Sequence, residues 1–187
     1  DAVVNCSGPG AAAALGAAPA IPMASTVGVL AFTPPMALTL RSMLHVDDLD
    51  IRSDGAGRLM LHKVSVDAQL TGAVPSSPDG PEAESLLGAA ALVLPALRGT
   101  AIEAIRTTMR PIPGDGLTCA GQLPQLAGYY VAVTHSGATI APFLGKAMAD
   151  EIVRGRPSEK LNDFRPDRFF ARAAATAGPA ARTLAKA

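Results

Sequence analysis

Aromatic residues are scarce in this sequence, since they make up 4% of its 187 residues and tryptophan is absent. No apolar run approaches the ~20 residues that a membrane-spanning helix needs. Basic and acidic residues number 16 each, and the basic ones are spread singly along the chain. These absences argue against a transmembrane helix and against a nucleic-acid-binding surface. Hydrophobic residues, by contrast, make up 49% of the chain, which predicts a globular protein rather than a disordered one.

The cysteines and histidines are too few and too scattered for the usual metal centres. Cys6 and Cys119 both stand in apolar, strand-like surroundings. This favours two buried free thiols in a reducing cytoplasm over a disulfide or a metal pair. His45 and His62 have no second ligand at metal spacing, and we interpret them as structural. The sequence therefore predicts a cytoplasmic protein without a metal site.

The most informative stretch is 128–154, where an apolar strand leads through a polar turn into a helix. Residues 129–133 are aromatic and β-branched, without charge. Apolar residues then recur at helical spacing from about residue 139, and Gly155 predicts the end of the helix. The turn leaves backbone N–H groups without partners at the positive end of the helix dipole. Such a turn can hold a phosphate, a carboxylate or a carbonyl oxygen.

A second glycine turn stands near the start of the chain. Residues 2–6 predict a strand, and residues 11–18 predict a short helix. The motif Gly8-x-Gly10-x-x-Ala13 between them matches the spacing of a dinucleotide-binding fingerprint. However, Pro9 removes a backbone donor, and no acidic residue follows at the distance that the fingerprint requires. We therefore interpret the turn as the end of a late strand rather than as the primary pyrophosphate loop.

The middle of the chain predicts an antiparallel sheet with one helix. Asp54-Gly55 stands between two β-prone segments and indicates a hairpin over residues 51–62. A linker over residues 74–81 leads into a helix that runs to about residue 94, with Asp79 as its predicted N-cap. Further strands are predicted over residues 21–33, 38–45 and 100–109.

Two segments just before the strand–turn–helix stretch make a family resemblance specific. They are Arg110–Gly116, which contains Arg-Pro and Asp-Gly, and Cys119–Gly121. In this order the segments resemble the C-terminal part of FAD-dependent amine and amino-acid oxidoreductases. That family includes D-amino-acid oxidase, glycine oxidase and sarcosine oxidase. The resemblance covers roughly residues 1–170. The chain departs from it in having only Ser136 between the histidine and the glycine of the turn.

The resemblance implies a mixed α+β and α/β fold. It would comprise part of an FAD-binding, Rossmann-like domain and an inserted antiparallel-sheet domain that binds the substrate. The expected segments are 1–26 for the first part of the FAD-binding domain, 27–109 for the substrate domain, 110–156 for the return to the FAD-binding domain and 157–187 for a C-terminal tail.

Arg110 is the candidate substrate-binding residue. In the family that the chain resembles, an arginine in this segment can pair with a substrate carboxylate, and the guanidinium group matches a carboxylate with two parallel donors. The alternative is a structural arginine that holds the loop through Asp115. No residue is assigned a catalytic role.

The resemblance also implies a non-covalent FAD. Some sarcosine oxidases carry a flavin-linked cysteine just before the arginine, where this chain has Thr107, Thr108 and Met109. A helix N-terminus beside the flavin would stabilise the negative charge that hydride transfer leaves on the ring. For His135 the alternative is that it only orders the turn. The candidate cofactor-binding residues are Gly8, His135, Ser136, Gly137, Ala138, Thr139 and Ile140.

We therefore expect the C-terminal portion of an FAD-dependent oxidoreductase that oxidises the C–N bond of an amino acid or secondary amine by hydride transfer to flavin. The chain begins with Asp1 inside a predicted strand. This favours a fragment that lacks the N-terminal FAD-binding segment and is inactive alone. The alternative is a non-catalytic subunit or remnant that offers a substrate-domain surface to a partner.

Overall fold

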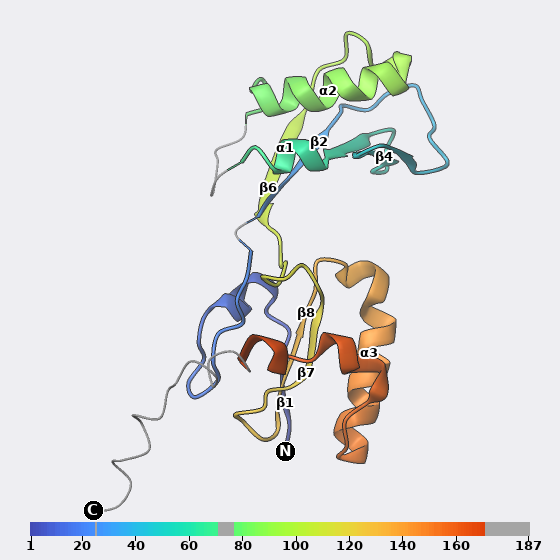
Figure 1. Ribbon diagram of the computed structural model, residues 1–187. Coiled ribbons are helices and arrows are strands. Elements are labelled where there is room, and N and C mark those ends of the chain that lie inside the picture. Colours follow the sequence, from blue (N-terminus) through green and yellow to red (C-terminus); the bar gives the residue numbers. More distant parts are fainter. Residues whose placement is uncertain (25, 71–76, 171–187) are drawn as a thin grey trace, which may run out of the picture. The chain divides into compact units, whose positions relative to one another are not determined.

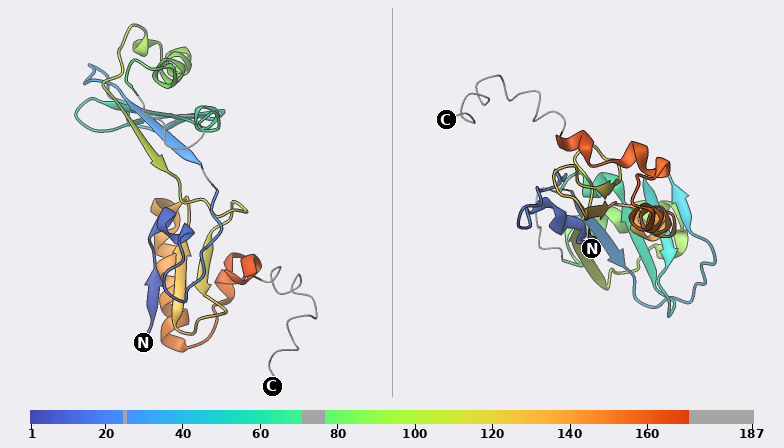
Figure 2. Two further views of the ribbon diagram at one scale, coloured as in Figure 1. Left: turned by 90° about the vertical axis from the view of Figure 1, so that its left-hand side faces the viewer. Right: turned by 90° about the horizontal axis from the view of Figure 1, so that it is seen from below.

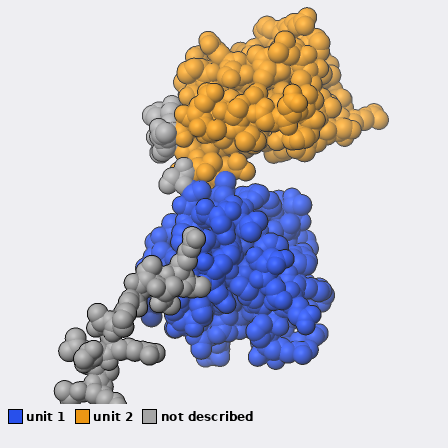
Figure 3. Space-filling model, in the orientation of Figure 1, with its two compact units in different colours: residues 1–24, 111–187 blue, residues 25–110 orange. Residues whose placement is uncertain are grey.

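The computed structural model describes residues 1–24, 26–70 and 77–170. The chain forms two compact units, coloured separately in Figure 3. The first unit combines Asp1–Ala24 with Pro111–Ala187, and the second is the continuous segment Ser25–Arg110. The described residues contain no helix with the length and apolar content that crossing a membrane requires.

The first unit is built on a three-stranded sheet in the order β1-β8-β7. Strand β1 runs parallel to β8, with Val3 opposite Tyr129, and β7 is antiparallel to β8. Helix α3 follows β8 and lies along one face of the sheet (Figures 1 and 2). The elements are β1 (Val3–Asn5), η1 (Gly8–Ala12), β7 (Cys119–Gln122), β8 (Tyr129–Val133), α3 (Gly137–Arg154) and η3 (Glu159–Phe164).

Strand β8 is uniformly apolar because both of its faces are covered. Tyr130 packs with Leu144, Met148 and other residues between the sheet and α3. Its neighbours in the strand, Tyr129 and Val131, point the other way into a cluster with residues of the N-terminal segment. Alternating side chains of a strand point to opposite faces, so a strand with two covered faces has no polar positions.

Helix α3 ends where the sequence predicts. Gly155 adopts the left-handed conformation of a C-cap, with φ of 61°. The buried face of the helix carries Leu144, Ala147, Met148 and Glu151 at helical spacing. Helix α3 begins at Gly137, two residues before the predicted start.

The second unit is a five-stranded antiparallel sheet in the order β3-β4-β5-β2-β6. Helix α2 covers one face of this sheet, as Figure 1 shows, and buries Ala83, Leu86 and Ala90 against Val29, Leu61 and other sheet residues. The elements are β2 (Val27–Phe32), β3 (Leu44–Val46), β4 (Leu49–Ser53), β5 (Leu59–Lys63), α1 (Val64–Asp67), α2 (Pro81–Val93), η2 (Pro95–Leu97) and β6 (Ala104–Met109).

The predicted hairpin is the β4–β5 pair. Its connection has positive φ at three successive residues, namely 78° at Gly55, 47° at Ala56 and 75° at Gly57. A Cβ at position 57 would lie 2.9 Å from the carbonyl oxygen of Met36, so only glycine fits there without a shift. The Asp54-Gly55 signal thus located the turn correctly.

Three local predictions were wrong. Residues 11–18 form no α-helix: η1 ends at Ala12, and Leu15 then bridges back to Ala18 through a turn in which Gly16 has φ of 60°. The predicted strand over residues 38–45 is reduced to β3. Residues 38–43 pair with no described strand, although Leu38 and Leu40 pack against the core of the second unit. The N-cap of α2 is Gly80 rather than Asp79, because Pro81 already occupies the first helical position.

The two cysteines differ in their surroundings, contrary to the prediction that both are buried. Both thiols are free, but Cys6 is exposed and only Cys119 is buried. Cys6 follows β1, whose hydrogen-bonded neighbour within the described residues is β8 alone. Burial raises the pKa of the Cys119 thiol to about 12. The predicted 74–76 part of the linker lies outside the described residues.

Candidate functional site

The candidate cofactor-binding residues gather at one edge of the first unit's sheet. Strands β1 and β8 are parallel, with Asn5 opposite Val131, so both strands end at the same edge. The turn with Gly8 leaves this edge after β1, and the turn that opens α3 leaves it after β8. In open sheets of this kind, ligands bind beyond the carboxyl ends of the parallel strands.

Asn5 shapes the first of these two turns. Its side-chain oxygen accepts hydrogen bonds from the backbone N–H of Ser7 at 3.0 Å and from the Ser7 hydroxyl at 2.7 Å. Its amide nitrogen donates to the Tyr129 hydroxyl at 3.0 Å, which ties the turn to β8. Such asparagine turns stabilise backbone that leaves a strand. Gly8 then begins η1 with φ of 60°, a conformation that glycine adopts without strain.

Thr134 orders the second turn. Its hydroxyl oxygen accepts from the Ser136 N–H at 3.1 Å and from the Thr118 hydroxyl at 2.9 Å. His135 is exposed, and its ring Nδ1 lies 3.0 Å from the Ser136 hydroxyl. The Thr134 hydroxyl and the contact between His135 and Ser136 therefore both order the turn, and nothing in the sequence pattern singled out the threonine.

The start of α3 offers fewer free donors than the predicted set of residues contains. The N–H groups of Thr139 and Ile140 both donate to the carbonyl oxygen of Ser136, at 3.0 Å each. For the N–H groups of Gly137 and Ala138, the described residues provide no acceptor, as is usual in a first helical turn. A Cβ added at Gly137 would meet nothing within 4 Å, so the space in front of this backbone is open.

A groove of about 390 Å³ runs from this turn along α3 and is bordered by Val4, Cys6 and Thr134 on the strand side. On the helix side, small residues follow one another at four-residue spacing. They are Gly137, Ala141, Gly145 and Ala149. Small side chains let another backbone or a ligand approach the helix closely. This spacing is visible in the sequence, but sequence reasoning did not use it.

Arg110 lies at the end of the second unit. Its backbone N–H donates to the Thr26 carbonyl oxygen at 2.8 Å. Asp115, the partner that one alternative gave to Arg110, pairs with Arg168 at 3.1 Å. The charge partner of Arg110 is instead Asp67, at 3.4 Å.

His45 and His62 also belong to ion pairs, and neither stands alone. Asp50 lies between them, 2.6 Å from the Nδ1 of His45 and 3.2 Å from the Nδ1 of His62. Within the described ranges, no three His, Cys, Asp or Glu side chains converge as metal ligands do.

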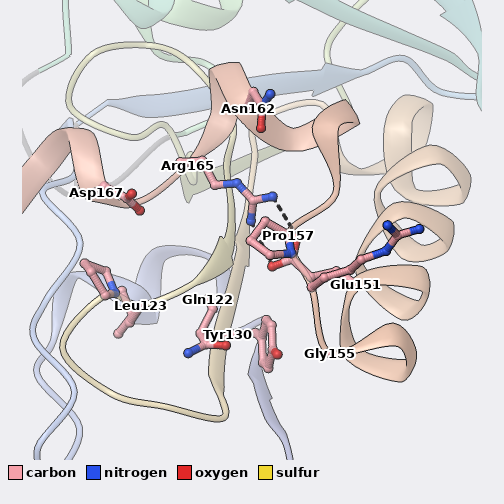
Figure 4. Close-up of a pocket in the computed structure, with 11 residues that line it drawn as sticks. Gln122, Leu123, Tyr130, Glu151, Gly155, Pro157, Asn162, Arg165 and Asp167 are labelled. Carbon is pink, nitrogen blue, oxygen red and sulfur yellow. Dashed lines mark hydrogen bonds and ion pairs between the residues drawn. The ribbon is translucent and has the colours of Figure 1, made fainter.

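A further pocket of the first unit contains none of the predicted residues. It has a volume of about 590 Å³ and lies between β7, the end of α3 and η3 (Figure 4). Inside it, Glu151 pairs with Arg165 through two contacts of 2.8 Å, and Arg165 also donates to the Ser158 carbonyl oxygen. Burial raises the pKa of Glu151, but the bonds from Arg165 and from the Ser158 N–H together outweigh burial and leave it below its ordinary value. These side chains satisfy one another, which is typical of a structural contact.

Comparison with known protein families decides the affiliation of the chain. Residues 1–151 match the family of FAD-dependent oxidoreductases. The chain belongs to this family. Membership confirms the resemblance that Arg110–Gly116 and the strand–turn–helix stretch indicated. A comparison with curated proteins finds no significant match.

Solved structures of flavoenzymes share the fold of this FAD-dependent oxidoreductase chain. Glycine oxidase from Geobacillus kaustophilus has a TM-score of 0.63 at 21% identity over 78% of this chain and 39% of that one. L-Proline dehydrogenase from P. horikoshii has a TM-score of 0.68 at 18% identity over 81% and 41%. L-Amino acid deaminase from Proteus myxofaciens, solved in complex with anthranilate, has a TM-score of 0.62 at 13% identity over 80% and 45%.

These matches confirm the predicted fold class, a mixed α and β architecture of the FAD-dependent oxidoreductase type. At such identities the likeness concerns the fold alone. The chain spans about two fifths of the length of the glycine oxidase and proline dehydrogenase chains, 39% and 41%.

Proposed function

We propose that this chain supplies the flavin-facing helix and the substrate-binding sheet of an FAD-dependent oxidoreductase that oxidises a C–N bond of an amino acid or secondary amine. The observation that carries the proposal is the meeting of two turns at one sheet edge in front of α3. The parallel pairing of β1 with β8 puts the Gly8 turn and the Gly137 turn there. Residues 1–26 and 110–156 would belong to the FAD-binding domain, and 27–109 would be the substrate domain.

The residues at the start of α3 fit a bound flavin ring. The N–H groups of Gly137 and Ala138 point out of the first helical turn, and the open space beside Gly137 lets a ring approach the backbone. Two donors and the positive end of the helix dipole would face a carbonyl oxygen of the ring. FAD, when bound non-covalently there, would accept the hydride from the substrate.

The protein would stabilise the reaction without a proton-transferring side chain at this turn. Charge that develops on the ring is met by fixed backbone N–H dipoles, which need no reorganisation during the reaction. Arg110 would hold the substrate carboxylate and so orient the carbon that loses hydride. The product imine would then hydrolyse in water.

The first test compares two glycine-to-valine substitutions. Gly137→Val fills the space in front of the turn, and Gly88→Val is the control, because Gly88 is also an exposed helical glycine with nothing within 4 Å of its added Cβ. We expect Gly137→Val to abolish or strongly weaken FAD binding in a fluorescence titration, while Gly88→Val binds FAD like the parent. Equal FAD affinity in both variants would refute the assignment of α3 to the flavin.

The second test concerns Arg110. In the complete enzyme, Arg110→Ala should weaken the binding of carboxylate substrates far more than the binding of FAD, since removing one partner of a desolvated charge pair costs about 2–5 kcal/mol. Steady-state kinetics gives the apparent substrate affinity, and the flavin titration gives the FAD affinity. If FAD dissociates while the apparent substrate affinity stays unchanged, Arg110 has a folding role instead.

A second candidate is a non-catalytic module that offers its substrate-domain surface to a partner. The coding DNA upstream of Asp1 separates the two candidates. A reading frame that encodes a strand and Gly-x-Gly-x-x-Gly favours the enzyme, whereas a start codon close to Asp1 favours the module.

A further inference from the structure

A buried carboxylate holds the guanidinium group of Arg110, and it belongs to Asp67 at the end of α1. The Asp67 side chain is 2% exposed, and the Arg110 side chain is 28% exposed. The Oδ2 atom of Asp67 lies 3.4 Å from the Arg110 guanidinium and 3.0 Å from Nε2 of His62. Its Oδ1 atom accepts from the backbone N–H of Val29 at 2.8 Å. One carboxylate therefore joins the arginine, a histidine and the sheet.

The sheet explains why Asp67 stands there. Strand β2 pairs with β5 only at Ala31 and Phe32, and the last two residues of β5, His62 and Lys63, pair with β4 but not with β2. The N–H of Val29 would otherwise lack an acceptor on that side. The Asp67 carboxylate accepts this N–H in place of a strand partner. The bond holds the carboxylate in position beside the Arg110 guanidinium.

The aliphatic part of the Arg110 side chain packs against Gly28 of β2. A Cβ at Gly28 would lie 3.1 Å from two stem carbons of Arg110, which is closer than nearly all real contacts. Glycine at this position in β2 therefore makes room for the aliphatic part of the arginine. The backbone N–H of Arg110 is bonded to Thr26 as well. Backbone, stem and guanidinium are thus all held by β2 and Asp67.

The hydrogen-bonded chain continues from Asp67 toward solvent. His62 lies between two carboxylates, with Nε2 on Asp67 and Nδ1 3.2 Å from Asp50. Asp50 also contacts His45, whose side chain is 67% exposed. The bond to Asp67, supported by the one to Asp50, outweighs burial and raises the pKa of His62 above its ordinary value.

We propose that Asp67 and His62 are positioning residues for Arg110, and that the proton on His62 controls how strongly Arg110 binds a carboxylate. This inference rests on the proposed role of Arg110 in substrate binding. It adds a pH-dependent step to that role, and it assigns a purpose to a polar cluster of the second unit.

The sign follows from the charges that face one another. With His62 protonated, two cations, Arg110 and His62, meet two carboxylates, Asp67 and Asp50, and the cluster is neutral. When His62 loses its proton, the same cluster carries one net negative charge, and Asp67 compensates Arg110 alone. A substrate carboxylate is then repelled more and finds Arg110 less available. Carboxylate affinity therefore falls as pH rises through the folded pKa of His62.

The test measures anthranilate binding to the full 187-residue chain with excess FAD, by calorimetry at about pH 6 and about pH 8.5. Linked sites typically alter each other's affinity at least about fivefold, so we expect a loss of at least about fivefold at the higher pH. His62→Gln keeps a hydrogen-bonding side chain but cannot carry the charge, and it should make the affinity independent of pH. His45→Gln is the matched control and should keep the dependence of the parent.

A second readout needs no ligand. Nuclear magnetic resonance of labelled histidines gives the pKa of His62 directly. Arg110→Gln should raise this pKa because it removes a nearby positive charge, and Asp67→Asn should lower it because it removes the main partner of the ring. If Arg110 and His62 are not coupled through Asp67, Arg110→Gln leaves the pKa of His62 unmoved. Asp67→Asn should also increase anthranilate affinity at about pH 8.5.

The outcomes separate this inference from the function on which it rests. If anthranilate binds through Arg110 but with the same pH dependence in His62→Gln, or if Arg110→Gln leaves the pKa of His62 unchanged, the positioning role is refuted and the binding role survives. If anthranilate does not bind, or binds equally to Arg110→Gln, the proposed role of Arg110 fails and this inference fails with it.

Discussion

Replacing Arg165 by methionine removes the partner of a carboxylate inside the first unit. The side chain of Glu151 is 4% exposed and that of Arg165 is 16% exposed, and two contacts of 2.8 Å join them. After the replacement, Glu151 keeps only the Ser158 N–H, at 2.8 Å, among these donors. Breaking a buried ion pair from one side costs about 3–5 kcal/mol, and we expect the free energy of unfolding of this unit to fall by that amount.

The tyrosines make this unit observable by itself. The sequence has no tryptophan, and its two tyrosines, Tyr129 and Tyr130, both lie in β8. Tyrosine fluorescence during urea unfolding therefore reports on the first unit and not on the second. With a urea m value of about 2 kcal/mol/M, the expected loss moves the midpoint by about 2 M.

A matched control lies on the same helix. Lys146 and Asp150 form an ion pair of 3.3 Å whose side chains are 71% and 36% exposed. Lys146→Met should cost no more than about 0.5 kcal/mol, because exposed pairs of this spacing contribute little. A double variant with methionine at both Glu151 and Arg165 should recover most of the loss, since no charge is left unpaired. Equal midpoints for Arg165→Met and Lys146→Met would refute the reasoning.

Three further predictions follow from burial and backbone geometry. A thiol reagent should modify only Cys6 in the native chain and should reach Cys119 only in denaturant, because burial raises the pKa of Cys119 to about 12; rapid reaction of both would contradict this. Gly57→Ala should lower the thermal midpoint by circular dichroism more than Gly55→Ala does, since both have positive φ, 75° and 78°, but only at position 57 would the Cβ meet a carbonyl oxygen at 2.9 Å. The folded pKa of Glu151 is lowered, so its carboxylate stabilises the first unit above the unfolded pKa of about 4.3, and this stabilisation is lost as pH falls through the folded pKa. The free energy of unfolding of Glu151→Gln should therefore depend less on acid pH than that of the parent.

Local patterns predicted much of the fold. The apolar strand 129–133, the helix that follows it and its end at Gly155 were correct, because each depends on residues that are neighbours in the sequence. The hairpin at Asp54-Gly55 was correct for the same reason. Residues 11–18 were predicted as a helix from their alanines, but Gly16 and Pro19 allow a turn there instead.

Contacts between distant residues were beyond local patterns. The partner of Arg110 is 43 residues away, and no spacing rule distinguishes Asp67 from Asp115, which stands nearby in the sequence. The exposure of Cys6 depends on which strands flank β1, which its own residues do not determine. For the turn that opens α3, the sequence indicated where strand gives way to helix, but only the structure shows that the N–H groups of Thr139 and Ile140 are already engaged.

The pairing of β2 with β6 has a consequence for how such enzymes diversify. Val27 stands opposite Met109, so the chain enters and leaves the second unit on adjacent strands, about 4.8 Å apart. The two ends of the segment 25–110 are therefore held together by its own strand pairing. The length of the segment adds little to the entropic cost of folding the rest of the polypeptide. A segment joined in this way can be exchanged as a cassette: recombination at the seam between Thr26 and Arg110 would install a new second unit on an unchanged first unit.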